Sequence, residues 1–315
     1  MKVTVEETTG KLYGKLWPEY DDQQYLDSVA LFEKRWTMNR EPPDFFRGKD
    51  CLDVGCGGGR FSIAMASMGA RSVVGVDVSE SGLADAQRRV EGLRISNVEF
   101  RTASALDLPF PSGSFDFVCC SGVLHHTLGV ERGLAEIHRV LRPDGSVYLL
   151  LYGAGGLFWP SNYLTRSLAA LLGQEEVERG MVEAGYNAAR RRSVLDDLFV
   201  PVLETYSEEK VRAMLQAAGF SRTRTWTQGR LDHESSLQDM LKEMESRWTL
   251  WQRLTQTCES SSQVYVAQQG ARLYEWAIST VQYLLAQYQS GHLSETQVRQ
   301  AVIGSGHTRL IATRD

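Results

Sequence analysis

A glycine-rich turn between a β-prone run and a helical segment is the feature that most constrains the fold of this chain. Asp50 to Val54 is a short, largely apolar run typical of a β-strand, and Arg60 to Met68 carries apolar residues at helical spacing. The turn between them holds four glycines, Gly55, Gly57, Gly58 and Gly59. Glycines at such a turn let a ligand approach the backbone closely. We therefore predict a strand–turn–helix unit with a ligand site at the turn.

The alternation of strands and helices continues to residue 152. Further strands are expected at 72–78, 97–101, 115–121 and 146–152, with helices at 80–93 and 130–141. This alternation implies a parallel sheet covered by helices on both faces. It stops after Gly153, where 157–206 is typical of two helices and an extended segment. It resumes with a helix capped by Ser207 and a strand at 220–226.

The residues around the turn indicate which ligand it binds. A phosphate-binding loop needs Lys-Ser/Thr where this chain has Arg60-Phe61, and the dinucleotide fingerprint needs a third glycine at position 60. The register is instead D-x-G-x-G-x-G, with Asp53 two residues before Gly55. A carboxylate there repels a pyrophosphate and attracts an ammonium or sulfonium. Asp77, at the end of the second strand, is suited to accept hydrogen bonds from ribose hydroxyls. The predicted ligand is a nucleoside with a cationic amino-acid tail.

Five motifs in order resemble those of the class I S-adenosylmethionine-dependent methyltransferases. Leu52 to Arg60 resembles their motif I, and Gly75 to Ser79 resembles their second motif. The segment from Leu108 to Asp116, the stretch from Val123 to His126 and the stretch from Leu141 to Gly145 match the regions that flank the fourth and fifth strands. Together the motifs cover about residues 50–152. The resemblance implies an α/β fold of Rossmann-like type, with a doubly wound, seven-stranded, mostly parallel sheet.

The resemblance also implies S-adenosyl-L-methionine as the cofactor, bound by residues of these motifs. Asp77 would bind the ribose hydroxyls, Val78 would pack on the adenine, and Ser121 would lie near the sulfonium. The motif I residues would line the methionine and ribose side, namely Asp53, Gly55, Cys56, Gly57 and Arg60. No metal is expected.

Ser104-Ala105 departs from the pattern of the family, which often has Asp-Ala at this place. The acid of that pair holds the adenine amino group. With serine instead, adenine recognition would rest on the Ala105 backbone or on Ser104 alone.

Three residues are candidates for catalysis at the carboxyl edge of the sheet. Methyl transfer from a sulfonium is an in-line displacement, in which the enzyme positions the nucleophile and excludes water. A hydroxyl acceptor usually needs a general base, whereas an amine or thiolate needs little help. His125 or His126 could be that base, and Tyr152 is a second candidate. In the alternative interpretation, the two histidines only orient their loop.

The domain organisation that follows has six parts. We expect an aromatic-rich helical segment at 1–48, the cofactor-binding core at 49–152, a helical lid insertion at 153–206, a continuation of the core at 207–227, a helical extension at 228–303 and a last strand within 304–315. The extension has an apolar stripe that includes Leu273, Trp276 and Val281. It is either an insertion before an antiparallel seventh strand at Thr308–Thr313 or a separate subdomain that mediates homodimerisation.

The composition indicates which class of substrate and which cellular location to expect. The formal net charge of −5 argues against nucleic acid as the substrate, since polyanions favour basic surfaces. The five cysteines show no paired spacing typical of zinc sites and suit a reducing cytoplasm. No run approaches the roughly 20 apolar residues that span a bilayer. We expect methyl transfer to a small, partly apolar organic acceptor. The alternatives are a different transfer reaction on the same fold, such as aminopropyl transfer, and a binding module without catalysis.

Overall fold

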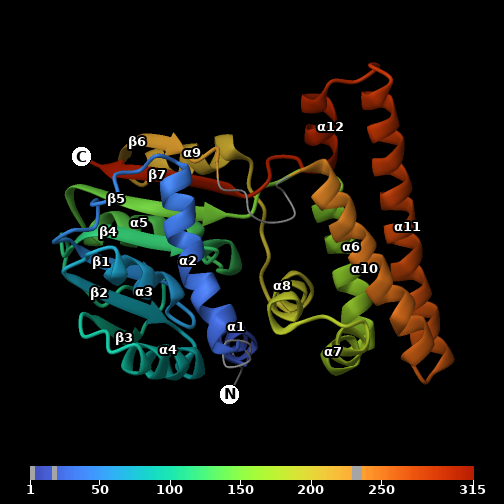
Figure 1. Ribbon diagram of the computed structural model, residues 1–315, viewed down its shortest axis with the longest axis horizontal. Helices are drawn as coiled ribbons and strands as arrows, with labels where there is room; N and C mark the ends of the chain where they lie inside the picture. The colour runs from blue at the N-terminus through green and yellow to red at the C-terminus, as the bar shows by residue number, and fades with distance from the viewer. Residues whose placement is uncertain (1–3, 16–19, 229–235) are drawn as a thin grey trace. The chain divides into compact units, whose positions relative to one another are not determined.

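The computed structural model describes residues 4–15, 20–228 and 236–315, which form two compact units (Figure 1). The first unit comprises Met1–Tyr152, Pro201–Gly229 and His307–Asp315. The second comprises Gly153–Val200 and Arg230–Gly306. The first unit contains the sheet, and the second is helical. The segment 201–206, which was expected to be part of the lid insertion, belongs to the first unit.

The sheet has seven strands in the order β3-β2-β1-β4-β5-β7-β6, which confirms the predicted fold class. The pairs among β1 to β5 are parallel, and β7 runs antiparallel to both of its neighbours, β5 and β6. The strand expected at 308–313 is therefore an inner strand of the sheet. The strand bounds are β1 Asp50–Val54, β2 Ser72–Asp77, β3 Val98–Thr102, β4 Phe115–Ser121, β5 Leu141–Leu151, β6 Phe220–Thr225 and β7 Thr308–Arg314.

The order of the strands brings the functional motifs to one edge. The chain winds outward in one direction from β1 to β3 and in the other from β4 onward, so the order reverses between β1 and β4. Val54, at the end of β1, pairs with Val76 on one side and Cys120 on the other. The residues that follow these strands therefore meet at the carboxyl edge, beside the reversal. In open α/β sheets ligands bind in this crevice.

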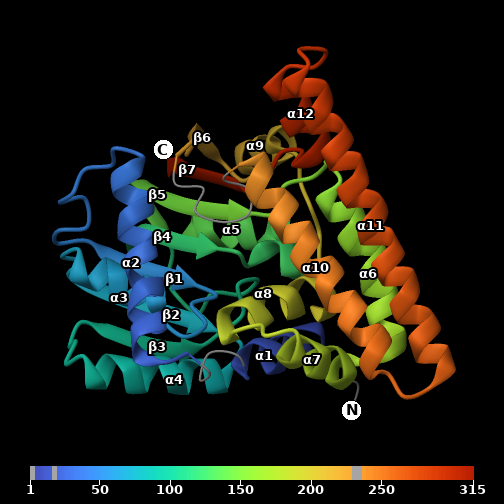
Figure 2. The ribbon, with the colours of Figure 1, turned by 45° about the vertical axis from the view of Figure 1, so that its right-hand side comes forward.

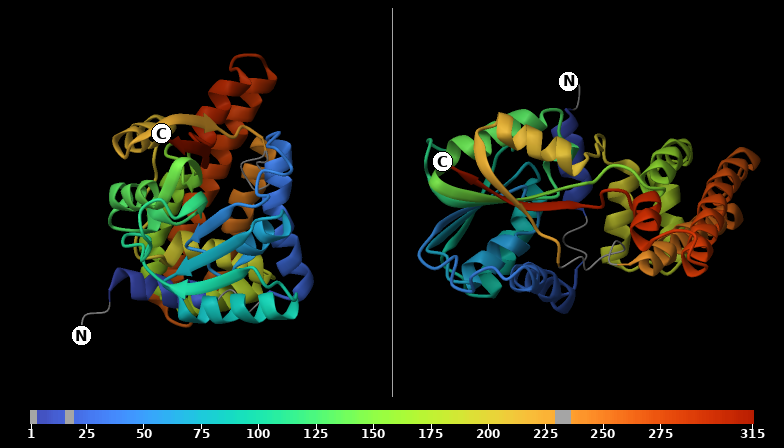
Figure 3. Two further views of the ribbon diagram at one scale, coloured as in Figure 1. Left: turned by 90° about the vertical axis from the view of Figure 1, so that its left-hand side faces the viewer. Right: turned by 90° about the horizontal axis from the view of Figure 1, so that it is seen from above.

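Helices cover both faces of the sheet (Figure 3). Side chains of α2 and α3 pack with Phe117 and Tyr148 on one face, and those of α5 and α9 pack with Val118 and Leu149 on the other. This division follows the period of two along β4 and β5. The helix bounds in this unit are α1 Val5–Gly14, α2 Asp22–Met38, α3 Arg60–Ser67, α4 Glu80–Gly92, the short 3₁₀ helix η1 Leu124–His126, α5 Val130–Val140 and α9 Glu208–Ala217.

The second unit consists of six helices among the residues that the structure describes (Figure 2). The long α10 and α11 pack closely at Gly270, where a side chain would collide with the ring of Trp251. None of the described helices is both long and apolar enough to cross a membrane. The bounds are α6 Phe158–Leu172, α7 Gln174–Glu183, α8 Ala188–Phe199, α10 Leu237–Thr257, α11 Ser261–Gln289 and α12 Glu295–Val302.

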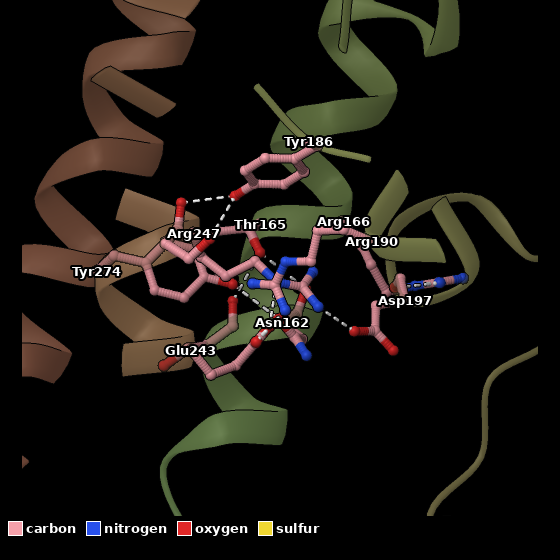
Figure 4. A network of polar contacts seen from close by, with 11 residues as sticks. Asn162, Thr165, Arg166, Tyr186, Arg190, Asp197, Glu243, Arg247 and Tyr274 are labelled. Carbon is pink, nitrogen blue, oxygen red and sulfur yellow. Dashed lines mark hydrogen bonds and ion pairs between the residues drawn. The ribbon is translucent and has the colours of Figure 1, made fainter. Parts of the chain in front are cut away.

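A buried polar network holds four helices of the second unit together (Figure 4). Arg247 of α10 is 1% exposed, and its Nε donates to Glu243 Oε1 over 2.7 Å. A second guanidinium nitrogen of Arg247 pairs with the carboxylate of Asp197 on α8. The Tyr274 hydroxyl of α11 donates to Asn162 Oδ1 of α6 over 2.7 Å. The network therefore joins α6, α8, α10 and α11 by polar contacts in addition to apolar packing.

Several local expectations differ from the structure. β5 begins at Leu141, five residues before the expected start, because Leu141 pairs with Phe115 ahead of an irregularity in the register. The region 157–206 holds three helices, since Gly173 separates α6 from α7. The predicted stripe of α11 was wrong at Trp276, which is 60% exposed. The buried face of α11 is centred instead on small residues and Tyr274, because the helix packs closely on α10.

Candidate functional site

The glycine turn is bound to β2 by its backbone and shaped by left-handed residues. The N–H groups of Gly55 and Cys56 donate to the carbonyl of Val76 over 2.8 and 3.0 Å. Gly55, Gly57 and Gly59 have φ of 69°, 52° and 76°, a region that other residues rarely adopt. A Cβ on Gly59 would lie 2.7 Å from the ring of Phe100. The glycines are therefore required both by the backbone conformation and by the close packing of the turn.

Asp77 links the glycine turn to the loop after β2. Its Oδ2 accepts a hydrogen bond from the Gly57 N–H and its Oδ1 accepts one from the Ser79 N–H, each over 2.8 Å. Burial raises the pKa of this carboxyl, and the hydrogen bonds from Ser79 and Gly57 oppose that shift. Two backbone donors hold the carboxylate in one orientation at the carboxyl edge of the sheet.

Asp53 lies beneath the turn and is 2% exposed. Its Oδ2 accepts from the hydroxyl of Ser62 on α3 over 2.7 Å. Burial raises the pKa of Asp53 to about 7, against the opposing effects of the Ser62 hydrogen bond and the charge of Arg60. This carboxyl can therefore gain or lose a proton near neutral pH, and a cation bound nearby would favour its ionised form.

The remaining motif I residues, Cys56 and Arg60, have different surroundings. Cys56 is buried, and its sulfur lies close to Gly75, where a Cβ would be 2.9 Å away. Burial raises the pKa of its thiol well above the ordinary value. Arg60 begins α3, and its guanidinium lies 4.5 Å from the centre of the Phe61 ring. The Cys56 side chain thus packs below the turn, so a contact with a ligand would come from its backbone.

The N-terminal helix α1 packs against the second motif and the Ser104 segment. A Cβ on Gly10 would lie 3.1 Å from the carbonyl oxygen of Val78. The hydroxyl of Ser104 donates to the carboxylate of Glu6 and accepts from the Leu106 N–H over 3.0 Å. Ala105, beside Ser104, has its side chain in the core. α1 lies within the helical segment expected at 1–48, and the capping box of Thr4 and Glu7 marks its start.

Tyr25 of α2 supports the glycine turn from the other side. It is 1% exposed, and its hydroxyl donates to the carbonyl of Gly58 over 2.6 Å. Burial raises the pKa of Tyr25, so the phenol stays protonated and remains a donor. The guanidinium of Arg89 lies 4.3 Å from the centre of its ring. Only the pairing of α2 with the turn in three dimensions reveals this positioning role.

The three candidate catalytic residues lie together at the carboxyl edge. The His125 ring stacks on Tyr152 with centroids 3.9 Å apart, and the His126 ring centre is 4.0 Å from that of His125. His126 Nδ1 lies 2.9 Å from the carbonyl oxygen of Val202. A carbonyl only accepts, so Nδ1 carries the proton and the neutral ring has its lone pair on Nε2. Ser121 ends β4, three residues before η1, which contains both histidines.

His125 and His126 differ in environment. His125 is fully buried, and burial lowers its pKa well below the ordinary value, with a further contribution from His126. Within the described residues neither ring nitrogen of His125 has a hydrogen-bond partner. His126 is 5% exposed, and its ring centre lies 6.0 Å from that of Tyr13 on α1. His125 is therefore a neutral packing group, and His126 has the tautomer that a base requires.

Comparison with known proteins finds a methyltransferase domain in the core of the chain. Residues 52–149 match the sequence model of the family described as "Methyltransferase domain". A demethylmenaquinone methyltransferase of Listeria welshimeri is 34% identical over 152 residues, which cover 47% of this chain and 63% of that relative. Residues 52–149 are thus similar to a methyltransferase domain, and the chain spans less than two thirds of the length of this relative. S-adenosylmethionine is the cofactor of the domain.

Solved structures extend the likeness to the fold of the chain. Phospholethanolamine N-methyltransferase 2 of Haemonchus contortus, solved with phosphomonomethylethanolamine and S-adenosylhomocysteine, is 17% identical with a TM-score of 0.51. The alignment covers 99% of this chain and 61% of that one. The [4+2]-cyclase SpnF is 19% identical with a TM-score of 0.50, covering 91% and 80%. At these identities the likeness concerns the fold alone.

The residues of the methyltransferase domain fit its cofactor. A left-handed glycine backbone at Gly55 and Gly57 exposes main chain to a ligand. Asp77 is oriented by two backbone donors at the same edge. Asp53 is a buried acid whose charge a nearby cation would stabilise. The donor and acceptor types thus match a cationic nucleoside rather than a pyrophosphate.

Proposed function

We propose that this chain transfers the methyl group of S-adenosylmethionine by in-line displacement to a small organic acceptor through an O, N, S or C nucleophile. The observation that carries this proposal is that the carboxyl edge of one sheet holds both an oriented acid, Asp77, and a histidine whose Nδ1 carries the proton, His126. The acid belongs to the cofactor motifs, and the histidine follows β4, the next strand beside β1. One ligand at this edge could therefore be bound by Asp77 and also contact His126.

The proposed cofactor contacts follow the motifs. Asp77 would accept from the ribose hydroxyls, and Val78 would pack on the adenine. Gly55, Gly57 and the backbone of Cys56 would contact the methionine portion. The charge of Asp53 would favour binding of the cationic tail. Arg60, in the same motif, would line the methionine and ribose side, and Ser121 would lie near the sulfonium. The bound cofactor supplies an electrophilic methyl group, and the chain orients it and excludes water.

The proposed proton acceptor is Nε2 of His126. Its Nδ1–H is used by the Val202 carbonyl, which fixes both the ring orientation and the tautomer. An acceptor hydroxyl would give its proton to Nε2 as its oxygen attacks the methyl carbon. Tyr152 supports the pair by stacking on His125, and its backbone carbonyl accepts from the Tyr206 N–H over 2.9 Å. For an amine or thiolate acceptor the base would contribute less.

The acceptor class rests on two observations. The relative from Listeria welshimeri is named a demethylmenaquinone methyltransferase, which supports a small organic acceptor. The net charge of −5 disfavours nucleic acid.

The five cysteines are free and buried, which suits the predicted cytoplasmic location. The lid role of residues 153–206 and a homodimer through the C-terminal helices stay predictions. Light scattering of the purified chain at several concentrations tests the homodimer.

The decisive experiment has two stages. Calorimetric titration of the chain with S-adenosylmethionine and S-adenosylhomocysteine should give saturable binding, and the thermal midpoint should rise with either ligand. NAD should produce neither effect. Transfer of the labelled methyl group is then measured with panels of phenols, amines and thiols, and with demethylmenaquinol.

Each result distinguishes a different hypothesis. Label in a small acceptor, lost with the variant His126→Ala, supports the proposal. Binding without label in any acceptor would instead favour a binding module or a different transfer reaction. No binding of either nucleoside would contradict the proposal altogether.

A further inference from the structure

The first helix contributes a carboxylate to the part of the site where the Ser104 motif has none. Ser104 stands at the position of a family acid, and its hydroxyl donates to the carboxylate of Glu6, 98 positions away in the sequence. Both residues are partly buried in the same unit. The contact therefore brings a negative charge to the place where the motif has lost one.

The seating of α1 explains why Glu6 reaches this place. Glu6, Gly10 and Gly14 are spaced four residues apart, so they lie on one face of the helix. A Cβ on Gly10 would lie 3.1 Å from the Val78 carbonyl oxygen, and one on Gly14 would lie 2.5 Å from the Ser79 hydroxyl. Two glycines thus let the helix backbone approach the loop after β2 closely. Glu6, on the same face of the helix, therefore lies beside Ser104.

The hydrogen-bond capacities of the pair favour the carboxylate as the acceptor for a further ligand. A serine hydroxyl has one proton, which Ser104 directs to Glu6, and its oxygen accepts from the Leu106 N–H over 3.0 Å. A carboxylate has two oxygens with about four acceptor positions, of which Ser104 uses one. Hydrogen bonds to a charged acceptor are also the stronger kind. Ser104 therefore orients Glu6, and Glu6 has the acceptor capacity.

From this geometry we infer that Glu6 accepts a hydrogen bond from the exocyclic amino group of the cofactor adenine. This inference rests on the proposed function, because it needs the adenine beside Val78. Ser104 acts as a positioning residue that holds the Glu6 carboxylate. Glu6 also sets the base specificity, since a carboxylate attracts the 6-amino group of adenine and repels the 6-oxo group of hypoxanthine.

The test compares two nucleosides that differ in that group and in the proton on the adjacent ring nitrogen N1. S-adenosylhomocysteine and S-inosylhomocysteine are titrated calorimetrically into the full chain. The wild-type protein should prefer the adenine compound by at least about tenfold, since a site built to accept a hydrogen bond rejects a group that cannot donate. Glu6→Ala should bring the ratio of the two affinities close to one. A wild-type-like preference in Glu6→Ala overturns the inference.

A neighbouring residue offers a matched control. Glu7→Gln removes the same charge from the same helical turn, but glutamine retains the capping box with Thr4. Its preference should equal that of the wild-type protein. Equal losses in Glu7→Gln and Glu6→Gln would show an effect of helix charge alone and would overturn the specific role of Glu6.

A relocated carboxylate separates this inference from a general loss of folding. In the double variant Glu6→Ala/Ser104→Asp the acid returns to position 104, and the preference for adenine should return to within a few fold of the wild-type value. A double variant without preference overturns the inference. If the wild-type chain binds S-adenosylhomocysteine but Glu6→Ala keeps its preference, only this inference fails. If the wild-type chain binds neither nucleoside, the proposed function fails first.

Discussion

The imidazole ring of His125 stacks on the phenol ring of Tyr152, with ring centroids 3.9 Å apart and planes inclined by 29°. His125 is fully buried with a strongly lowered pKa, so it is neutral at physiological pH and acts through packing. Its neighbour His126 points Nδ1 at a carbonyl and therefore carries a basic Nε2. Two adjacent histidines that look equivalent in the sequence thus have different physical roles.

This difference predicts that substitution of His126 lowers the methyl-transfer rate, whereas substitution of His125 mainly changes the stability of the fold. His126→Ala should lower the methyl-transfer rate by about 10²- to 10⁴-fold for a hydroxyl acceptor, the usual contribution of a general base. Cofactor affinity, measured by calorimetry, should stay within a few fold.

His125→Phe preserves a ring for stacking on Tyr152. We expect a change in the free energy of unfolding of less than about 1.5 kcal/mol and a turnover within a few fold of wild type. His125→Ala, which leaves a cavity, should cost about 3 kcal/mol. A wild-type rate in His126→Ala would support the interpretation in which the pair only orients the loop.

Asp77 should dominate cofactor affinity. Asp77→Ala removes both the proposed ribose contact and the acceptor for the Gly57 N–H, so the affinity for S-adenosylhomocysteine should fall by at least about tenfold, or about 1.4 kcal/mol. The exposed Asp44 of the same unit provides a control, and Asp44→Ala should bind as the wild-type protein does. Calorimetry measures both. A smaller loss in Asp77→Ala rejects the ribose assignment.

The raised pKa of Asp53 predicts that cofactor binding depends on pH. Below about pH 7 the carboxyl of the free protein is protonated, and a bound cation must expel that proton. The affinity for S-adenosylmethionine should therefore increase as pH rises from 5 to 7, by at most about tenfold per pH unit, and then level off.

Two controls isolate the charge of Asp53. Methylthioadenosine lacks the cationic tail, so its affinity should change little over this range, and Asp53→Asn should flatten the dependence for S-adenosylmethionine. An unchanged slope in Asp53→Asn would assign the titration to another group.

The same group affects stability with the opposite sign. The folded-state pKa of Asp53 lies above that of an ordinary aspartate, near 4, so the native state binds more protons between these values. The contribution of Asp53 to stability is therefore fully present below pH 4 and is lost as pH rises through 7, by on the order of 4 kcal/mol. Asp53→Asn should unfold at a temperature that depends less on pH in this range, as calorimetric scans would measure.

The buried ion pairs of Arg247 should govern the stability of the helical unit. Arg247→Met removes the Arg247 guanidinium from the buried carboxylates of Asp197 and Glu243, although Glu243 keeps its ion pair with Arg190, and we expect a loss of about 3–5 kcal/mol in urea unfolding. Arg253→Met, at an exposed position of the same helix, should cost less than about 1 kcal/mol.

Removing the whole charge cluster tests the cause of that loss. The triple variant Arg247→Met/Asp197→Leu/Glu243→Leu should recover most of the stability, because it removes both buried carboxylates that Arg247 pairs with, and the Arg190 that loses its Glu243 partner is partly exposed. If the triple variant is no more stable than Arg247→Met, lost packing rather than buried charge explains the effect.

The sheet of the core was predictable because its signals are local. Each of β1 to β4 lies within one or two residues of its expected position, since alternating apolar runs, glycine turns and caps act over short distances. The start of β5 could not be predicted in this way, because Leu141 joins the sheet by pairing with Phe115 of β4 and not through a pattern in its own segment. The buried face of α11 also depended on a partner, the Trp251 ring of α10.

The sequence alone predicted a methyltransferase domain and its cofactor, because the glycine turn, Asp53 and Asp77 lie within 25 consecutive residues and their types indicate the ligand chemistry. Tertiary structure decided which histidine has a basic nitrogen, since that depends on the carbonyl of Val202, 76 positions away. It also decided that Glu6 meets Ser104 across 98 positions. Such contacts arise where separate segments pack against one another, and no spacing along the chain encodes them.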